Sequence, residues 1–359
     1  MKRIIVLLCV IVGLSDLLLA QTSNLRYVDA KKLNLIGKIA PTPQLYHRVD
    51  TTRYRDFTPN QNILVTEAAG LALCFKTNSS RISVHTYFHS MGNGANMTGI
   101  NQYGYDLYIK KNKEWLYAAS KAKYEKDNLL PLISNMDTSQ KECLLYLPAF
   151  SVIDSIKIGI DEQSDIESLP NPFRHRIIIF GSSFTHGTSA NRSSMSYPLM
   201  VERDTGLYIM NLGVSGNSKL QQSFARVLAD ADADAFIFDA FSNPSAKEIE
   251  ERFDSFVKTI RASHPTTPLI FMQTIYREER NFDKRADRYE QDKMDMAEKV
   301  VKEAMKRDRN IYFINPKNYT GDDHVTSTDG IHPSALGYYR WAKTIEPLLL
   351  TILKKYRIE

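Results

Sequence analysis

The sequence predicts an α/β domain that is preceded by an all-β domain. From about Asn24 to Phe173, short segments rich in β-branched and aromatic residues alternate with turn signals, a pattern typical of a sandwich or jelly roll. After Arg176, apolar strands alternate with helical segments, which indicates a parallel sheet covered by helices on both faces. The stretch from Ser168 to Phe173 contains two prolines and is predicted to be the linker between the two patterns.

The first twenty residues are typical of a secretion signal. Lys2 and Arg3 precede an apolar run from Ile4 to Leu14, and Leu18-Leu19-Ala20 offers a cleavage site. The alternative is a membrane anchor, but Asp16 interrupts the run and few apolar residues remain for a full span. We therefore expect residues 1–20 to be removed on export, which leaves a secreted or periplasmic protein with no integral membrane span.

Residues 21–170 are expected to form an accessory β-sandwich domain. The clearest strand signal is Ser155 to Ile160, where every second residue is isoleucine. The expected strands are residues 63–66, 71–76, 82–87, 105–110, 115–118, 142–147 and 152–160.

Residues 174–359 are expected to form the domain that carries the functional site. The expected strands are residues 176–180, 208–212, 235–239, 269–273 and 311–314. The expected helices lie near residues 197–204, 219–229, 246–263, 285–307 and 334–355. Open parallel sheets bind ligands beyond the C-terminal ends of their strands, so polar residues that follow these strands are the candidates for function.

The charge of the chain bears on its possible partners, and its cysteine content bears on whether it contains a disulfide. The chain has 46 Lys and Arg against 41 Asp and Glu, a net charge of +5, and the two signs are interspersed. No basic stripe indicates a nucleic-acid partner. Removal of the signal leaves Cys74 and Cys143. Export would permit a disulfide between them. However, their apolar neighbours favour two buried thiols, and a chain of this length can bury a core large enough to be stable without a disulfide.

A serine at the end of the first parallel strand is the candidate nucleophile. The strand 176–180 runs into Gly181-Ser182-Ser183, and we assign the role to Ser183 with Ser182 as its competitor. A serine after a strand is more often only a helix cap. The assignment therefore depends on whether other sequence segments supply the remaining catalytic groups. The sequence lacks the G-x-S-x-G elbow of α/β-hydrolases, because Thr185 occupies the last position.

A late Asp and His pair completes the constellation for nucleophilic acyl transfer. Asp329 lies three residues before His332, just ahead of a predicted helix. His332 would take the proton of the serine as general base, and Asp329 would orient the imidazole and stabilise its cation. The alternative role of Asp329 is a helix cap, and the two roles are compatible.

The oxyanion of such a reaction needs donors aimed at it. The turn Leu212–Asn217 follows the second strand and contains glycines that let backbone N–H groups approach a substrate. Asn243 follows the third strand and offers a neutral amide donor. Taken alone, each of these segments would be a plain turn.

Two other histidines could take part in the site in place of His332 or beside it, and the same late loop could instead bind a metal. His186 lies close to Ser183 in sequence and is a candidate substrate contact, whereas His324 lies in an acidic loop. Asp322-Asp323-His324 and the Asp329–His332 pair offer carboxylates and imidazoles that could bind a divalent metal, but they match no defined metal motif. We therefore expect no metal.

Taken together, these blocks resemble the SGNH hydrolases, also called GDSL esterases. Gly181-Ser182-Ser183 is similar to the Ser block, Ser215-Gly216 to the Gly block, Ser242-Asn243 to the Asn block, and Asp329-Gly330-Ile331-His332 to the final D-x-x-H block. The resemblance implies a flavodoxin-like α/β/α sandwich with a five-stranded parallel sheet. It also implies an oxyanion hole made by Gly216 N–H, the Asn243 amide and the Ser183 N–H.

The chain departs from the family pattern at the Ser block, where Ser182 replaces the usual Asp. It resembles a subgroup in which a Ser or Thr stands there and a β-rich N-terminal domain carries a G-x-D-L-Y segment, here Gly104 to Tyr108, beside Tyr46 to Asp50. Members are typically exported bacterial esterases, often acting on acetylated polysaccharides, and the family implies no cofactor.

The resulting expectation is a secreted serine esterase that removes short acyl groups, particularly acetyl, from a polysaccharide or oligosaccharide through an acyl-enzyme. Three alternatives stay open. The chain could be a catalytically inactive glycan-binding protein, an interpretation that the Ser182 replacement motivates. It could also be an esterase, lipase or thioesterase with a non-carbohydrate substrate, or a metal-dependent enzyme that uses the Asp322 to His332 loop.

Overall fold

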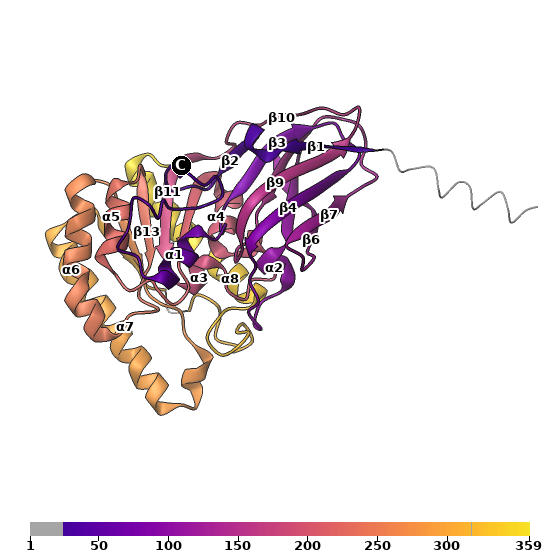
Figure 1. The fold of residues 1–359 in the computed structure, drawn as a ribbon. Helices are drawn as coiled ribbons and strands as arrows, with labels where there is room; N and C mark the ends of the chain where they lie inside the picture. The colour runs from indigo at the N-terminus through magenta and orange to yellow at the C-terminus, as the bar shows by residue number, and fades with distance from the viewer. Residues whose placement is uncertain (1–23, 317) are drawn as a thin grey trace, which may run out of the picture.

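The computed structural model describes residues 24–316 and 318–359 of the chain. The predicted signal, residues 1–20, lies outside the described residues. Figure 1 shows a β-rich part formed by the N-terminal half and, beside it, a layered part in which helices flank a sheet.

The β-rich part is a sandwich of two antiparallel sheets, as predicted. One sheet has the order β1-β9-β4-β7, and the other has the order β10-β3-β8-β5-β6, with β2 paired to β3. The two sheets share a core of apolar residues that includes Leu73, Val84, Leu145 and Ile158. The strands are β1 (Leu25–Asp29), β2 (Asn34–Ile36), β3 (Ala72–Thr77), β4 (Ile82–Ser90), β5 (Tyr105–Lys111), β6 (Glu114–Lys121), β7 (Asp127–Ile133), β8 (Lys141–Tyr146), β9 (Val152–Asp161) and β10 (Ile166–Ser168).

One predicted strand is wrong, and four strands were not predicted. Residues 63–66 belong to a helix, α1 (Pro59–Thr66), which begins with a capping box between Thr58 and Gln61 and has a proline in its first turn. The unpredicted strands are β1, β2, β7 and β10. A second short helix, α2 (Gly99–Tyr103), precedes β5.

The second part is a five-stranded parallel sheet between helices, which confirms the predicted fold class. Its order, β12-β11-β13-β14-β15, is the flavodoxin-like arrangement in which the first strand lies second from the edge. The strands are β11 (Arg174–Gly181), β12 (Leu207–Gly213), β13 (Ala235–Asp239), β14 (Leu269–Met272) and β15 (Ile311–Ile314). The helices are α3 (Ser183–His186), α4 (Tyr197–Thr205), α5 (Gln222–Asp230), α6 (Ala246–Ser263), α7 (Lys284–Arg307) and α8 (Ala335–Leu353).

Alternate residues of β11 face two different cores. Ile178 and Phe180 pack with apolar residues of α5, α6 and α7 on one face of the sheet. Ile177 and Ile179 pack with residues of α4 and α8 on the other. A strand buried on both sides needs apolar residues at every position, which explains the continuous run of isoleucines that predicted it.

The two N-terminal motifs join the sandwich to the parallel sheet. Asp106 of the G-x-D-L-Y segment is fully buried and accepts hydrogen bonds from Ser194 and from Ser120, the latter at 2.8 Å. Tyr108 of the same segment lies 3.2 Å from both Ser194 Oγ and Arg192 Nη2. Ser194 and Arg192 belong to the connection between α3 and α4. The motif therefore holds the segment that follows the candidate nucleophile.

Arg48, from the Tyr46 to Asp50 segment, makes the second junction. Its guanidinium is fully buried and donates to the carbonyl oxygens of Asn211 and Gly213 at 3.0 Å, and of Glu67 at 2.8 Å. It also donates to the carbonyl oxygen of Leu64. Asn211 and Gly213 lie at the C-terminal end of β12, so Arg48 ties this end of the sheet to α1.

Both cysteines are free and buried, as the sequence favoured. Cys74 of β3 pairs with Leu144 of β8, whereas Cys143 of β8 pairs with Phe75. Residues that pair directly across antiparallel strands share a face. Cys74 therefore faces the core shared with the parallel sheet, and Cys143 faces the core of the sandwich. A disulfide between them is excluded by this register.

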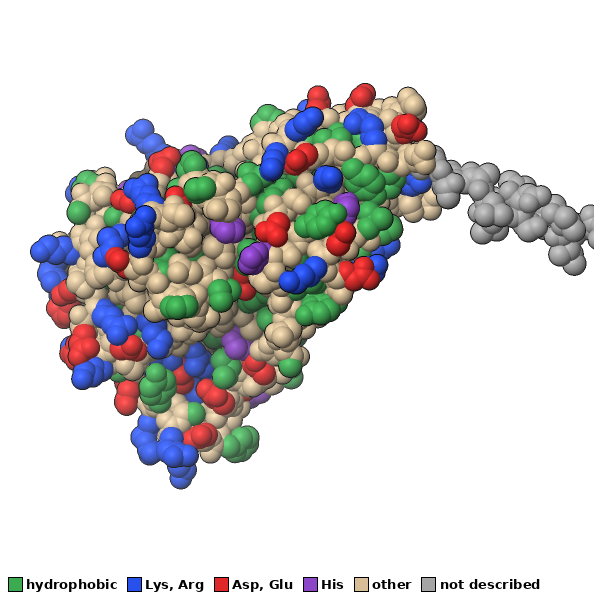
Figure 2. All heavy atoms as spheres, in the orientation of Figure 1, with side chains coloured by type: hydrophobic (Ala, Val, Ile, Leu, Met, Phe, Trp, Pro, Cys, Tyr) green, Lys and Arg blue, Asp and Glu red, His purple; other side chains and the backbone are tan. Residues whose placement is uncertain are grey.

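The helices and the charged side chains of the described residues bear on the expectations of no membrane span and no basic stripe. None of the helices in this described part of the chain combines the length and the apolar composition needed to cross a bilayer. Figure 2 shows basic and acidic side chains mixed over the visible face, with no continuous basic stripe.

Replacing Glu202 with glutamine is expected to stabilise the protein at neutral and alkaline pH. Glu202 of α4 is buried and accepts hydrogen bonds from Tyr146 Oη and Ile209 N, both at 3.0 Å. Burial raises the pKa of its carboxyl from 4.5 to about 8. Between these two pH values the folded state holds a proton that the unfolded state releases, so stability falls as pH rises through this window.

The variant should be about 2–4 kcal/mol more stable than the parent at pH 8, and the difference should vanish below about pH 4.5. Urea unfolding at pH 4.5, 6 and 8 measures it, with the exposed Glu167→Gln as a matched control. Burial also raises the pKa of Glu67 to about 8, but Glu67 is present in both proteins, so their difference isolates Glu202. Equal stability of parent and variant at pH 8 would contradict the argument.

Candidate active site

The order of the parallel sheet places three polar loops side by side. β11, which precedes Ser183, lies between β12 and β13. Gly213 of β12 pairs with Gly181 of β11, and Gly181 pairs with Asp239 of β13, so the three strands end at the same level. The segments that follow them contain Ser183, Gly216 and Asn243.

Ser183 begins a short helix directly after β11. Gly181 is needed for this tight turn, because a Cβ at its position would lie 2.1 Å from Thr185 Oγ1 and 2.9 Å from Asp239 Cβ. The Ser183 side chain stays within reach of the surface, since 7% of the residue is exposed. Its Oγ lies 2.9 Å from His332 Nε2. The serine and the histidine are therefore in direct hydrogen-bond contact across 149 residues of sequence.

Ser182, the other candidate for the nucleophile, is buried beside this contact. It has no exposed surface, and its Oγ accepts a hydrogen bond from Phe184 N, so it caps the helix that Ser183 begins. The same Oγ donates to Asp239 Oδ2 at 3.1 Å. Burial raises the pKa of Asp239 to about 6, although hydrogen bonds from Thr185 and Ser182 lower it. The structure thus gives the two serines different surroundings, and only Ser183 meets a histidine.

The loop before α8 is a folded unit that presents Asp329 and His332. Asp329 Oδ1 accepts hydrogen bonds from the backbone N of Ile331 at 3.0 Å and of His332 at 2.7 Å. Asp329 Oδ2 lies 2.8 Å from His332 Nδ1. Gly330 makes the turn possible with a φ of +87°. The carboxylate therefore shapes the loop and orients the imidazole at the same time.

Asp329 stays ionised because of these donors. Burial raises the pKa of its carboxyl, but hydrogen bonds from the backbone and side chain of His332, from Asn96 and from Ile331 outweigh burial and hold the pKa well below its usual value. The helix-cap alternative for Asp329 is wrong, since Ser334 caps α8 by accepting a hydrogen bond from Gly337 N.

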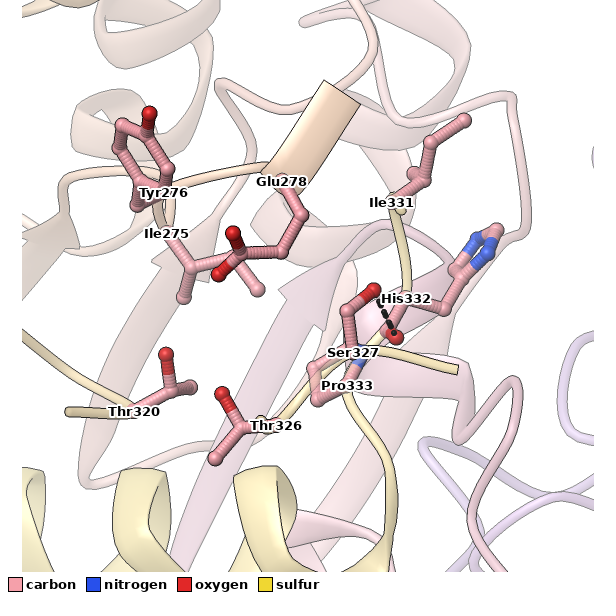
Figure 3. Close-up of a pocket in the computed structure, with 9 residues that line it drawn as sticks. All are labelled: Ile275, Tyr276, Glu278, Thr320, Thr326, Ser327, Ile331, His332 and Pro333. Atoms are coloured by element: carbon pink, nitrogen blue, oxygen red, sulfur yellow. Dashed lines mark hydrogen bonds between the residues drawn. The ribbon is translucent and has the colours of Figure 1, made fainter. Parts of the chain in front are cut away.

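The other side of this loop lines a small pocket, shown in Figure 3. Ser327 Oγ donates to the carbonyl oxygen of His332 at 3.2 Å, while the imidazole projects away from the pocket.

The acidic and histidine side chains that could have bound a metal make other contacts. Glu278, which also lines the pocket, lies 2.8 Å from His324 Nδ1. Asp323 forms an ion pair with Arg340 at 2.7 Å. In residues 24–316 and 318–359 there is no group of three or more His, Cys, Asp or Glu side chains arranged to hold a metal ion.

Gly216 and Asn243 lie on neighbouring loops beside Ser183. Gly216 is exposed, has a φ of +70°, and a Cβ built there meets no atom within 4 Å, so its surroundings are open. Asn243 Oδ1 accepts a hydrogen bond from Ser218 N at 3.2 Å. This bond joins the two loops and leaves the amide nitrogen of Asn243 as the group that can donate elsewhere.

His186 does not fit the substrate contact that we expected. It is 1% exposed, and its ring stacks on Phe150 with centroids 4.2 Å apart. Its Nε2 lies 2.9 Å from Ala149 O and its Nδ1 lies 3.1 Å from Ser215 Oγ, so neither ring nitrogen is free for a substrate. Burial, together with the positive charge of Arg48, lowers the pKa of His186 well below 6.5. Its neutral ring supports the turn that contains Gly216.

One polar contact in this region was not predicted from the sequence. Asn96, on the loop between β4 and α2, donates its amide to Asp329 Oδ2 at 2.7 Å. The surrounding sequence, Gly92-Asn93-Gly94, signals only a turn, and no motif marks Asn96. A contact across 233 residues could not be inferred without the packing of the two parts of the chain.

Two family descriptions cover most of the chain. The GDSL-like Lipase/Acylhydrolase family matches residues 174–350. The N-terminus of Esterase_SGNH_hydro-type, named GxDLY, matches residues 25–166. No curated protein sequence matches the chain.

Solved structures are similar over nearly the whole chain. A Bacteroides ovatus protein described as a GDSL-like lipase is 40% identical, with a TM-score of 0.90, and the match covers 92% of this chain and 98% of that one. The salicylyl-acyltransferase SsfX3 from a tetracycline biosynthetic pathway is 19% identical with a TM-score of 0.70, at the same coverage. A family two carbohydrate esterase from Cellvibrio japonicus, also at this coverage, is 12% identical with a TM-score of 0.62. The last two share the fold.

Proposed function

This chain belongs to the GDSL-like lipase/acylhydrolase family, and from that membership we propose that it is a secreted serine esterase acting on short-chain, mainly acetyl, esters of carbohydrate. The observation that carries the proposal is the continuous contact from Ser183 Oγ to His332 Nε2 at 2.9 Å and from His332 Nδ1 to Asp329 Oδ2 at 2.8 Å. This order of groups is the one that activates a serine hydroxyl.

The proposed reaction has two halves. Ser183 Oγ attacks the ester carbonyl while its proton passes to His332 Nε2, and Asp329 stabilises the imidazolium. The tetrahedral intermediate collapses when His332 returns the proton to the leaving alcohol, which leaves the acyl group on Ser183. Water then attacks the acyl-enzyme with His332 again as base, and the carboxylic acid departs as the Ser183 hydroxyl is restored. Gly216 N–H, the Asn243 amide and Ser183 N–H are assigned to the oxyanion.

Carbohydrate as the substrate rests on similarity of fold rather than on contacts. Proteins with this two-part fold include the Cellvibrio japonicus carbohydrate esterase and an acetyl xylan esterase from Butyrivibrio proteoclasticus, 14% identical with a TM-score of 0.57. The inactive glycan-binding alternative is disfavoured by the intact contacts of Ser183, His332 and Asp329.

Hydrolysis of 4-nitrophenyl acetate by the chain from Gln21 to Glu359 is the first test, followed by acetate release from acetylated xylan and other acetylated glycans. Parallel assays contain a chelator. Activity on both substrate types that the chelator leaves unchanged would support the proposal. Activity on the acetate ester alone would move the substrate away from carbohydrate, and activity lost with the chelator would contradict the serine mechanism.

Replacement of Asn243 by alanine is expected to lower kcat by about 10²–10³-fold with a smaller change in KM, because the lost donor acts on the oxyanion and not on the bound ester. Steady-state hydrolysis of 4-nitrophenyl acetate measures both constants. Asn60→Ala removes an exposed asparagine on α1 and serves as the matched control. A kcat for Asn243→Ala within twofold of the control would remove Asn243 from the oxyanion hole.

A further inference from the structure

The conformation of the loop of residues 91–98, between β4 and α2, is fixed by hydrogen bonds from a buried side chain. Gln102 of α2 is 4% exposed, and its Oε1 accepts a hydrogen bond from Gly94 N at 2.5 Å. Its Nε2 donates to the carbonyl oxygens of Gly94 and Met97, both at 3.1 Å. A single buried amide thus makes three hydrogen bonds to the loop backbone, which fixes the direction in which Asn96 projects.

The loop is also fastened to the segment that follows the nucleophile helix. Ser189 Oγ donates to Asn96 O at 2.9 Å, and Thr98 Oγ1 donates to Asn191 O at 2.6 Å. Asn101, just beyond the loop, donates to Gly187 O at 2.9 Å. These contacts place the 91–98 loop against residues 187–191, within a few residues of Ser183.

At this position Asn96 reaches the carboxylate that orients the histidine. Asn96 Nδ2 donates to Asp329 Oδ2 at 2.7 Å, and the same oxygen lies 2.8 Å from His332 Nδ1. The backbone N–H groups of Ile331 and His332 occupy the other oxygen. Of the four donors recorded on this carboxylate, three come from the Asp329–His332 loop itself and one comes from the β-sandwich.

We propose that Asn96 is a positioning residue, contributed by the β-sandwich, that holds Asp329 in place and thereby sets the orientation and basicity of His332. The inference rests on the proposed esterase function for its kinetic consequence. It gives the N-terminal part a direct role in the reaction, because the site in the parallel-sheet part is complete only when the 91–98 loop is docked on it.

The electrostatic consequence has a definite sign. The Asn96 amide directs the positive end of its dipole at Asp329 Oδ2 and so weakens the attraction between this oxygen and the His332 cation. Loss of the amide should therefore raise the pKa of His332. Other titratable groups near this pair include Ser183, Tyr338 and two glutamates. Glu278 lines the pocket on the other side of the loop, and the backbone N of Glu279 donates to Gly330 O at 3.1 Å. None of them is recorded as donating to the Asp329 carboxylate.

The test compares Asn96→Ala and Asn96→Leu with Asn93→Ala in the full mature chain. Leucine keeps the approximate volume of asparagine without a donor, and Asn93 is an exposed asparagine of the same loop. In both Asn96 variants we expect kcat/KM for 4-nitrophenyl acetate to fall by about tenfold, and its acid limb to move upward by about half a pH unit. Asn93→Ala should match the parent in both respects.

A second readout separates positioning from a purely structural contact. The chain has eight histidines, and the NMR signal of His332 can be assigned by its loss in a His332→Gln variant. Titration of that signal should show the raised pKa in both Asn96 variants. A lower melting temperature with an unchanged His332 pKa and an unchanged acid limb would overturn the proposal.

The NMR titration also keeps this inference separate from the proposed function. If the parent protein hydrolyses no ester, the proposed function fails, but a shifted His332 pKa in the Asn96 variants would still establish the positioning role. If the parent is active and the Asn96 variants match Asn93→Ala in rate, acid limb and His332 pKa, the function stands and the role of Asn96 is refuted.

Discussion

Replacement of Ser183 by alanine should reduce kcat by about 10⁴–10⁶-fold and leave the fold intact. The loss is large because no other group in the described site lies in hydrogen-bond contact with His332 Nε2. The fold should survive because the helix cap belongs to Ser182, and alanine removes only the Ser183 hydroxyl and its contact with His332 while the backbone hydrogen bonds to Ser183 O remain. Stopped-flow or steady-state hydrolysis of 4-nitrophenyl acetate gives the rate, and thermal unfolding gives the stability.

Ser182→Ala is the matched comparison, and it should show the opposite pattern. It removes the cap on Phe184 N and the 3.1 Å hydrogen bond to Asp239 Oδ2, which should cost about 1–2 kcal/mol of stability. The rate should fall far less than in Ser183→Ala, since Ser182 has no exposed atom. If Ser182→Ala abolished turnover and Ser183→Ala did not, the nucleophile would be misassigned.

Replacement of Arg48 by methionine should destabilise the protein by about 3–5 kcal/mol. The guanidinium has no exposed surface and donates to four carbonyl oxygens, which would be left buried without a donor. Burial lowers the pKa of Arg48 to about 10, so the group is still charged at neutral pH. Methionine fills a similar length but supplies no N–H.

Urea unfolding at pH 7 measures this effect, and Arg55→Met, at an exposed position, is the control. Two of the four carbonyls belong to Asn211 and Gly213, at the end of β12 that leads to the Gly216 turn. Turnover should therefore decline together with stability. A loss below about 1 kcal/mol would mean that water replaces the guanidinium, and that Arg48 is not the junction described above.

The sequence was most informative where one physical requirement dominates. The strands of the parallel sheet are buried on both faces, so their apolar runs stand out, and β13 and β15 have the predicted bounds. The strands that were missed have weaker signals. β7 contains Pro131, which a strand tolerates at a sheet edge, and β7 lies at the edge of its sheet. The helix α1 was missed although Thr58-Pro59 and Gln61 form a recognisable helix start.

In the site, too, some residues could be predicted from the sequence and others could not. Ser183, Asp329 and His332 could be chosen because acyl transfer requires these residue types, with the serine directly after a strand and the Asp and His close together on a late loop. The structure brings the three together. His186 was misjudged because nearness in sequence says nothing about which way a ring faces, and burial under Phe150 decided its surroundings. Asn96 was not foreseen because its contact depends on how one part of the chain docks on the other.

The placement of the two thiols on opposite sides of one sheet also affects how the protein can be made and followed. No oxidant or disulfide isomerase is needed to reach this fold, so a reducing cytoplasm suits its production. Burial raises the pKa of both thiols, that of Cys143 to about 12, which keeps them unreactive in the folded protein. Alkylation of Cys143 can therefore report the rate at which the sandwich opens, and alkylation of Cys74 the rate at which the sandwich separates from the parallel sheet.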